Sequence, residues 1–126
     1  MKQTCTVTMR ILVCLGVVGI VLVGCASPRE VLETGFPVTF NSKMSAPMLT
    51  MCIDRNTDGA ILNSLRTSIK YLGPDASEIV VWNGDTVYAV VQVKAKDKGS
   101  IALFRLGGGA TLTPESSMKR MTKGCE

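Results

Sequence analysis

The sequence contains no histidine among its 126 residues. Histidine is the usual general base near neutral pH, and it activates serine and cysteine nucleophiles in many enzymes. Its absence excludes Ser-His and Cys-His catalytic pairs and removes a common metal ligand. A carboxylate pair or a Ser–Lys dyad would still be possible, but the acidic residues are scattered along the chain. We therefore expect a protein that is not an enzyme and that holds no cofactor.

Several motifs of common binding sites are also missing. The sequence has no C-x-x-C, no G-x-x-x-x-G-K-[ST] and no G-x-G-x-x-G. Gly107–Gly109 therefore indicates a flexible connector rather than a phosphate-binding loop. The chain has 14 Lys and Arg residues. Lys2 and Arg10 lie in a leader segment that is expected to be removed, so the mature chain would carry 12 Lys and Arg against ten Asp and Glu. So small a positive charge argues against nucleic acid as a partner.

The first 24 residues have the composition of a secretory signal peptide. Lys2 and Arg10 carry the only charges, and an unbroken apolar run extends from Ile11 to Val23. The stretch from Ile11 to Gly24 has 14 residues, whereas a membrane-spanning helix needs about 20. A short apolar run behind basic residues favours a signal peptide over a transmembrane helix.

The signal ends in "LVGC", Leu22 to Cys25, which resembles the bacterial lipobox. In precursors with this motif the cysteine thiol is diacylated, the signal is removed before it, and the new amino terminus is usually acylated. The resemblance implies a signal peptide over residues 1–24 and a lipidated mature start at Cys25. By the sorting rule of Gram-negative lipoproteins, Ala26 implies the outer membrane. An uncleaved anchor or an ordinary secretory signal is the alternative.

Two or more lipid chains give stable membrane anchoring by themselves. We therefore expect the protein to contact the membrane through its N-terminal lipid, without a protein surface that binds the bilayer.

The five cysteines divide into three groups. Cys5 and Cys14 leave with the signal, Cys25 becomes the anchor, and Cys52 and Cys125 remain. Disulfides persist in oxidising compartments, so we expect these two to be joined. The loop from Cys52 to Cys125 spans 74 residues. Closing a loop of that length stabilises the folded state by about 4 kcal/mol, because it reduces the entropy of the unfolded chain. A redox-active or metal-binding pair is the alternative, and no C-x-x-C supports it.

The mature chain is expected to be a short tether followed by one domain. Residues 25–35 are interpreted as a lipidated tether that holds the domain off the membrane. Residues 36–126 are interpreted as a single periplasmic domain with no internal repeat. Phe36–Phe40 favours a strand at the edge of a sheet, because Pro37 cannot donate a hydrogen bond to a neighbouring strand.

A helix is expected between Ser45 and Gly59. Ser45 can cap its start, Pro47 suits its first turn and Gly59 suits its end. At helical spacing, one side carries Met48, Cys52 and Arg55, and from this Cys52 is expected to face inward. The next residues, 60–72, fit either a helix or a strand, and we favour a strand over about Leu65–Leu72.

A β-hairpin is the clearest structural signal in the chain. Asn83-Gly84 lies between two β-rich runs, which favours a type I′ turn at that position. In the second run, alternating apolar residues predict one buried face: Val87, Ala89, Val91, Val93 and Ala95. Their neighbours Tyr88, Gln92 and Lys94 are expected on the other face. Ile101 and Leu103 share one face of the strand that follows.

The end of the chain predicts a second helix. Thr113 can cap it, Pro114 suits its first position, and Gly124 suits its end. One apolar stripe runs along it: Met118, Met121 and Cys125. We expect an α+β fold, with an antiparallel meander of three to four strands. Two helices would cover one face of the sheet, and the disulfide would link them.

Asp54, Asn56 and Asp58, followed by Gly59, have the spacing that opens an EF-type calcium loop. Position twelve of such a loop supplies a bidentate carboxylate, and here it is Leu65. The calcium interpretation is therefore weak, and a polar turn at the end of a helix is favoured.

Five methionines raise the question of a copper(I) site: Met44, Met48, Met51, Met118 and Met121. Helical spacing favours them as fillers of the core instead. Trp82, the only tryptophan, lies next to the hairpin turn, where it could be a contact residue but is expected to be partly buried.

Together, "LVGCA", "SAP", "CIDRN", "IVVWNGDTVYAVVQV" and the closing "KGC" resemble small proteobacterial lipoproteins of unknown function. The resemblance implies an α+β domain in the cell envelope and no known catalytic residue. The leading hypothesis is an accessory or protein-binding module with an envelope protein as its partner. The alternatives are an inhibitor or small-ligand-binding lipoprotein, directed at a cell-wall hydrolase or an envelope ligand, and a cell-wall enzyme.

These hypotheses predict different surfaces. A binding module should expose an apolar patch on the free face of the sheet. An inhibitor should present a protruding loop near Gly107–Gly109, and an enzyme should have a cleft in which acids converge.

Overall fold

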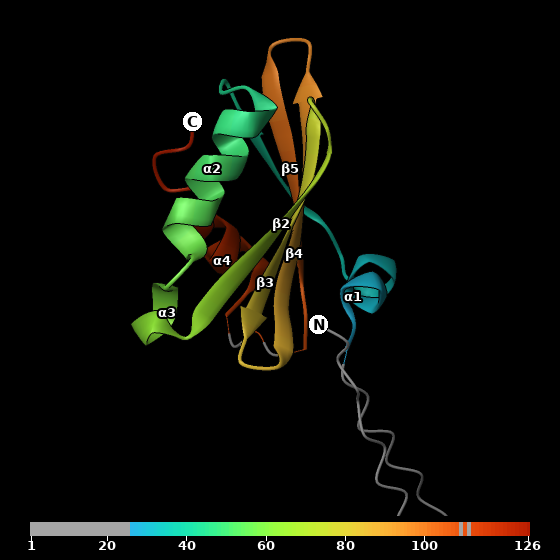
Figure 1. The fold of residues 1–126 in the computed structure, drawn as a ribbon, viewed down its shortest axis with the longest axis vertical. Coiled ribbons are helices and arrows are strands. Elements are labelled where there is room, and N and C mark those ends of the chain that lie inside the picture. Colours follow the sequence, from blue (N-terminus) through green and yellow to red (C-terminus); the bar gives the residue numbers. More distant parts are fainter. Residues whose placement is uncertain (1–25, 109, 111) are drawn as a thin grey trace, which may run out of the picture.

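Five antiparallel strands form one sheet in the order β1-β5-β4-β3-β2 (Figure 1). The computed structural model describes residues 26–108, 110 and 112–126, so the expected signal peptide and Cys25 lie outside it. The strands are β1 (Val38–Ser42), β2 (Leu65–Gly73), β3 (Ala76–Asn83), β4 (Thr86–Lys96) and β5 (Gly99–Leu106). The helices are α1 (Pro28–Thr34), α2 (Ala46–Thr57), α3 (Ala60–Asn63) and α4 (Pro114–Met121). The α+β class is confirmed, with more strands and helices than expected.

Strands β2 to β5 form the expected meander, in which each strand pairs with the next one along the chain. Strand β1 comes first in the sequence but pairs with β5 at the far edge of the sheet. This edge position agrees with the prediction from Pro37. Strand β4 lies in the centre, and its side chains from Val87 to Val91 are all buried. Strand β4 is therefore covered on both faces and contributes side chains to the apolar clusters on each side of the sheet.

The turn between β3 and β4 lies one residue later than expected. Asn83 pairs with Thr86, so the two-residue loop is Gly84-Asp85. Gly84 has a φ of +59°, and Asp85 does not have a positive φ. A type I′ turn needs positive φ at both loop residues, whereas glycine at the first loop position is typical of type II′. The hairpin was predicted correctly and its turn type was not.

Helix α2 crosses one face of the sheet and begins after Ser45, as expected. Its buried side consists of Ala46, Leu49, Thr50, Cys52, Ile53 and Thr57. Cys52 is buried, as expected, whereas Met48 and Arg55, which were predicted to share its side of the helix, are exposed. Two apolar stripes run side by side on this helix, and the fold buries the one that contains Leu49 and Ile53.

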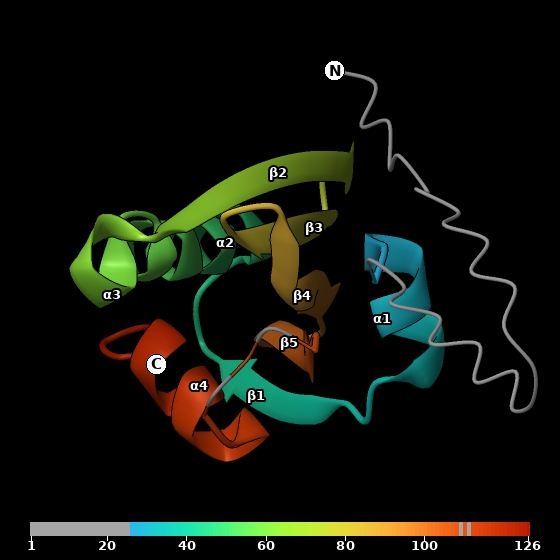
Figure 2. The ribbon, with the colours of Figure 1, turned by 90° about the horizontal axis from the view of Figure 1, so that it is seen from below.

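Helix α4 packs beside α2 on the same face of the sheet (Figure 2). The hydroxyl of Thr113 accepts a hydrogen bond from the Ser116 amide, which is the predicted N-cap. The helix ends at Met121, three residues before Gly124. The buried hydroxyl of Tyr88 lies 3.1 Å from that of Ser117 and fixes the helix against β4.

Helix α1 packs on the opposite face of the sheet, within the segment expected to be a tether (Figures 1 and 2). Ser27 caps it by accepting a hydrogen bond from the Glu30 amide. Val31 is buried against Val87 and Val90 of β4. Partly buried apolar side chains complete this group, which we call the α1 cluster: Ala26, Leu32, Val80 and Trp82. The two expected helices, α2 and α4, do share one face, but the expected arrangement is incomplete, because α1 covers part of the second face.

The alternation expected along β4 breaks at Tyr88. The register shifts between Val81 and Trp82, so that Val81 pairs with Ala89 and Trp82 pairs with Val87. Tyr88 is the extra residue of this β-bulge, and a bulge changes which face the side chains occupy. Val87 consequently joins the α1 cluster, whereas Tyr88 joins the main core beneath α2 and α4.

The ambiguous residues 60–72 divide into a short turn and a strand. Strand β2 covers Leu65–Gly73, which confirms the strand interpretation. Before it, Ile61, Leu62 and Asn63 all have positive φ, between 52° and 63°. Left-handed backbone costs about 1–2 kcal/mol per residue for side chains with a Cβ, so α3 is a strained left-handed turn rather than a regular helix.

Gly107 is closely packed, in contrast to the flexible connector expected for Gly107–Gly109. Its amide donates a hydrogen bond to the carbonyl of Tyr88. A Cβ at this position would lie 2.1 Å from the carbonyl oxygen of Val87, closer than two such atoms can approach. Gly108 has open space around it, and Gly109 lies outside the described residues.

Cys52 and Cys125 form the expected disulfide, with their Cα atoms 5.9 Å apart. The bond joins α2 to the C-terminal segment that follows α4. The hydroxyl of Ser42 donates a hydrogen bond to the Cys125 carbonyl, which ties the same segment to β1. The last residues of the chain are therefore held on two sides.

We expect Gly107→Ala to lower the free energy of unfolding by about 2 kcal/mol, because the added methyl group forces the backbone of β4 away. Gly108→Ala is the matched control, and it should change the free energy by less than about 0.5 kcal/mol. Urea unfolding of both variants measures the difference. Equal stabilities would contradict the close packing of Gly107.

The double variant Cys52→Ala/Cys125→Ala should lose about 4 kcal/mol of unfolding free energy, because the disulfide closes a loop across a sequence separation of 73. Denaturant unfolding measures this loss. As a check on the bond itself, thiol labelling of the unfolded, unreduced protein should find both cysteines blocked. Labelled thiols at these positions would refute the disulfide.

Candidate functional site

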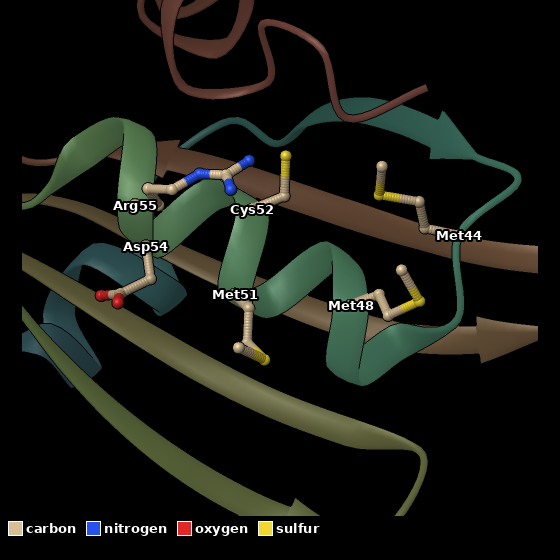
Figure 3. Close-up of a pocket in the computed structure, with 6 residues that line it drawn as sticks. All are labelled: Met44, Met48, Met51, Cys52, Asp54 and Arg55. Carbon is tan, nitrogen blue, oxygen red and sulfur yellow. The ribbon is translucent and has the colours of Figure 1, made fainter.

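The outer side of α2 and the chain just before it enclose a groove of about 350 Å³. We call it the methionine groove, and it is lined by Met44, Met48, Met51, Cys52, Asp54 and Arg55 (Figure 3). Met48 and Met51 are 59% and 65% exposed and line the same groove, and such a grouped apolar surface is more informative than a single exposed apolar side chain. The groove is therefore a largely apolar surface that is exposed to water.

The side chains of the groove come from neighbouring turns of α2. Figure 3 shows Met44 and Met48 pointing into the same space at the start of the helix. It shows Met51 and Asp54 on one side of the helix and Cys52 and Arg55 on the other. The thioether groups thus spread along the helix instead of converging on one point. This arrangement suits contact with an extended apolar partner and does not resemble a three-sulfur copper site.

The methionines only partly follow the prediction that they fill the core. Met121 is buried, and Met44 and Met118 are half-buried against the main core. Met48 and Met51 do not contribute to the core. Helical spacing suggested burial for all of them, but α2 turns a different stripe toward the sheet.

Buried contacts beneath the groove hold α2 in place. Leu49 and Ile53 are fully buried in the main core. The hydroxyl of Thr50 donates a hydrogen bond to the Ala46 carbonyl and lies 2.7 Å from the hydroxyl of Ser77 on β3. Both hydroxyls are buried, so their pairing satisfies groups that would otherwise be costly to bury. The groove therefore lies on a rigid support.

Asn56 connects α2 to the C-terminal segment. Its side-chain amide donates hydrogen bonds to the carbonyls of Met121, at 3.0 Å, and Lys123, at 2.9 Å. The same nitrogen lies 3.4 Å from the sulfur of Cys125. The amide satisfies carbonyl groups that follow the last turn of α4, where no helical partner exists. Asn56 and the disulfide thus fasten the same two segments together.

The calcium candidates Asp54, Asn56 and Asp58 have separate structural roles. The carboxylate of Asp54 accepts a hydrogen bond from the Thr67 hydroxyl, and Asp58 accepts one from the Thr67 amide at 3.2 Å. These two acids join the end of α2 to β2, whereas Asn56 points to the C-terminal segment. The residues belong to a helix and its cap, not to a loop that brings oxygens together. We therefore do not propose a calcium site here.

The charges at the far end of the groove are unequally engaged. Asp54 is half-buried and bonded to Thr67, whereas Arg55 is exposed. A partner at this end therefore meets the guanidinium group of Arg55 on the side of α2 that carries Cys52. Because guanidinium groups pair well with carboxylates, the groove suits an apolar segment that carries an acid.

Four further features considered in the sequence are Trp82, a metal site, a membrane-spanning helix and the lipidation candidate Cys25. Trp82 is half-buried in the α1 cluster, as expected. Within the described residues, no three His, Cys, Asp or Glu side chains form a group that could hold a metal ion. In the same part of the chain, no helix has both the length and the apolar character needed to cross a bilayer. The lipidation candidate Cys25 lies outside the described residues.

Sequence reasoning missed the methionine groove. It identified the methionines but expected them to be buried. The second apolar stripe of α2, which contains Met48 and Met51, could have indicated the groove. The charged residues Asp54 and Arg55 interrupt this stripe, so it is less suited to the core.

We expect Asn56→Asp to lower the unfolding free energy by about 3 kcal/mol, because a carboxylate would face two carbonyl oxygens and lose both hydrogen bonds. Asn83→Asp, at an exposed position in β3, is the matched control and should shift it by less than about 0.5 kcal/mol. Chemical denaturation at neutral pH compares the two. An Asn56→Asp protein as stable as the parent would show that Asn56 does not hold the C-terminal segment.

No family model matches the chain, and neither the comparison with curated proteins nor the comparison with solved structures returned a match.

Proposed function

We propose that the protein is a non-enzymatic lipoprotein of the outer membrane that binds an envelope protein through the methionine groove. The observation that carries this proposal is the exposure of Met48 and Met51 on a helix whose other side is fixed in the core. The groove would receive an apolar segment of the partner, and Arg55 would pair with an acidic side chain next to it.

The chemistry of methionine supports a role in binding. Its side chain is unbranched and polarisable, so it adapts to the shape of different apolar partners. Burying the two exposed thioethers on binding would remove apolar area from water, which stabilises the complex. The helix beneath is already ordered by Leu49, Ile53 and the disulfide. Binding would then require little additional ordering of the backbone, which favours affinity.

The location in the envelope rests on the sequence motif and on the disulfide. The lipobox-like stretch that ends at Cys25 supports lipid anchoring at the outer membrane, with the domain in the periplasm. A disulfide between Cys52 and Cys125 suits an oxidising compartment. The similarity to small proteobacterial lipoproteins supports the same location.

A small envelope ligand is the second candidate for the groove. Its volume of about 350 Å³ lies near the lower limit of the 300–1,000 Å³ typical of small-molecule sites. The groove is open along the helix, which favours a peptide segment over an enclosed ligand. The closely packed Gly107 gives no support to an inhibitory loop that would begin at this residue.

Photo-crosslinking in the intact envelope tests the proposal. A photoreactive amino acid is placed at Met48 or Met51, or at exposed Lys98 on the β4–β5 turn as the control. We expect both groove positions to trap the same protein and Lys98 not to trap it. Crosslinking to a small molecule instead would favour the second candidate, and equal trapping from Lys98 would contradict a role for the groove.

Substitutions in the groove provide the matched binding test. Met48→Glu/Met51→Glu should weaken binding of the trapped partner at least about tenfold, because charged side chains replace central apolar contacts. Met48→Leu/Met51→Leu keeps the apolar character and should retain most of the affinity. Both pairs of substitutions lie at exposed positions, so circular dichroism should show an unchanged fold. Unchanged affinity of the glutamate variant would contradict the proposal.

A further inference from the structure

We propose that the side of the domain formed by α1 and Trp82 lies directly on the lipid bilayer that holds the anchor. This inference rests on the proposed lipid anchoring at Cys25 and extends it. It differs from the expectation that the anchor alone contacts the membrane. The partner surface is the headgroup layer of a phospholipid membrane.

The length of chain between the anchor and the folded domain carries the argument. Ala26, the residue after Cys25, already packs against the α1 cluster, and Ser27 caps α1. Consecutive Cα atoms are about 3.8 Å apart, so one peptide link joins the lipidated residue to the domain. A flexible tether over residues 25–35 would instead have an average span of about 18 Å. The packing of Ala26 and α1 removes that slack.

The side chains near the anchor suit the membrane interface. Trp82 is half-buried and belongs, like Ala26, to the α1 cluster, and tryptophan is enriched at the headgroup level of membranes. Arg66 is exposed and lies opposite Trp82 across the β2–β3 pair. Phe36 follows α1 with 88% of its surface exposed. This side of the domain thus has two aromatic groups, and Trp82 has a cation opposite it that can pair with lipid phosphate.

The charges around α1 are mixed. Arg29 forms an ion pair with Glu33 at 2.8 Å, and Glu30 and Asp85 are also exposed. We therefore do not attribute the proposed membrane contact to a basic patch that attracts anionic lipid. Contact enforced by a short covalent link should persist at high salt.

This placement also orients the methionine groove. Figures 1 and 2 show α1 on one side of the sheet and α2 with α4 on the other. With α1 on the bilayer, the sheet separates the membrane from the groove. The groove then faces away from the lipid, where a partner in the periplasm can reach it.

Trp82 is the only tryptophan in the protein, so its fluorescence reports on one position. The lipidated protein is reconstituted in phosphatidylcholine vesicles with or without a nitroxide on the lipid headgroup. We expect the nitroxide to reduce the emission of Trp82 about twofold at low and high salt, because the ring lies at headgroup level. A matched probe, Trp82→Phe/Lys123→Trp, moves the tryptophan to the segment after α4 and should keep its emission.

A linker variant tests the cause of the contact. Eleven Gly and Ser residues, beginning with Ser, are inserted between Cys25 and Ala26 to restore a span of about 18 Å. In this linker variant, the fluorescence of Trp82 should regain most of the intensity that the nitroxide quenches in the parent protein. Equal quenching with and without the linker would overturn the short-link argument.

Mass spectrometry and vesicle flotation separate this inference from the proposed function. Acylated protein that floats with vesicles but shows unquenched Trp82 would overturn the placement of the domain and leave the anchor intact. Protein that carries no acyl group at Cys25 would overturn both. Quenching of Trp82, without quenching of the Lys123→Trp probe, supports the inference.

Discussion

The link between α2 and the C-terminal segment is the constraint on which the rest of the structure depends. The Cys52–Cys125 disulfide and the two hydrogen bonds from Asn56 hold these segments together. The disulfide joins parts of the chain that are far apart in sequence, so it reduces the freedom of the unfolded chain, and the hydrogen bonds stabilise the same link in the folded state. They also fix the position of α2, which carries the methionine groove on its outer side.

The sheet divides the molecule into two surfaces with different roles. Its central strand β4 is buried from Val87 to Val91, with the main core on one face and the α1 cluster on the other. Alternation along β4 supplies both faces with apolar side chains, and the bulge places Tyr88 and Ala89 together in the main core while Val87 and Val90 join the α1 cluster. One surface carries the groove, and the other includes Ala26, the residue after the proposed anchor Cys25. In our proposals the same sheet thus supports a partner site and a membrane contact.

The sequence predicted the parts of the fold that depend on short-range signals. The hairpin at Gly84, the capped helices after Ser45 and Thr113, and the edge strand after Pro37 each follow from residues a few positions apart. The predicted strand at Leu65 is also present. The Cys52–Cys125 pairing was also predicted, on the assumption that Cys5 and Cys14 belong to a signal peptide and Cys25 to a lipid anchor.

The details that sequence reasoning missed depend on which surfaces meet. Helix α1 lies in the segment interpreted as a tether, and its only apolar residues, the neighbours Val31 and Leu32, give no helical periodicity that would have indicated it. The exposure of Met48 and Met51 could not be read from spacing, because α2 has two apolar stripes and only packing selects between them.

By itself, the sequence determined the α+β class, the disulfide partners and the absence of histidine chemistry, since each follows from composition or local pattern. The tertiary structure decided that α1 packs on the second face and that the methionines line a groove. These outcomes depend on contacts between distant segments, and local sequence does not encode which of two similar faces is buried.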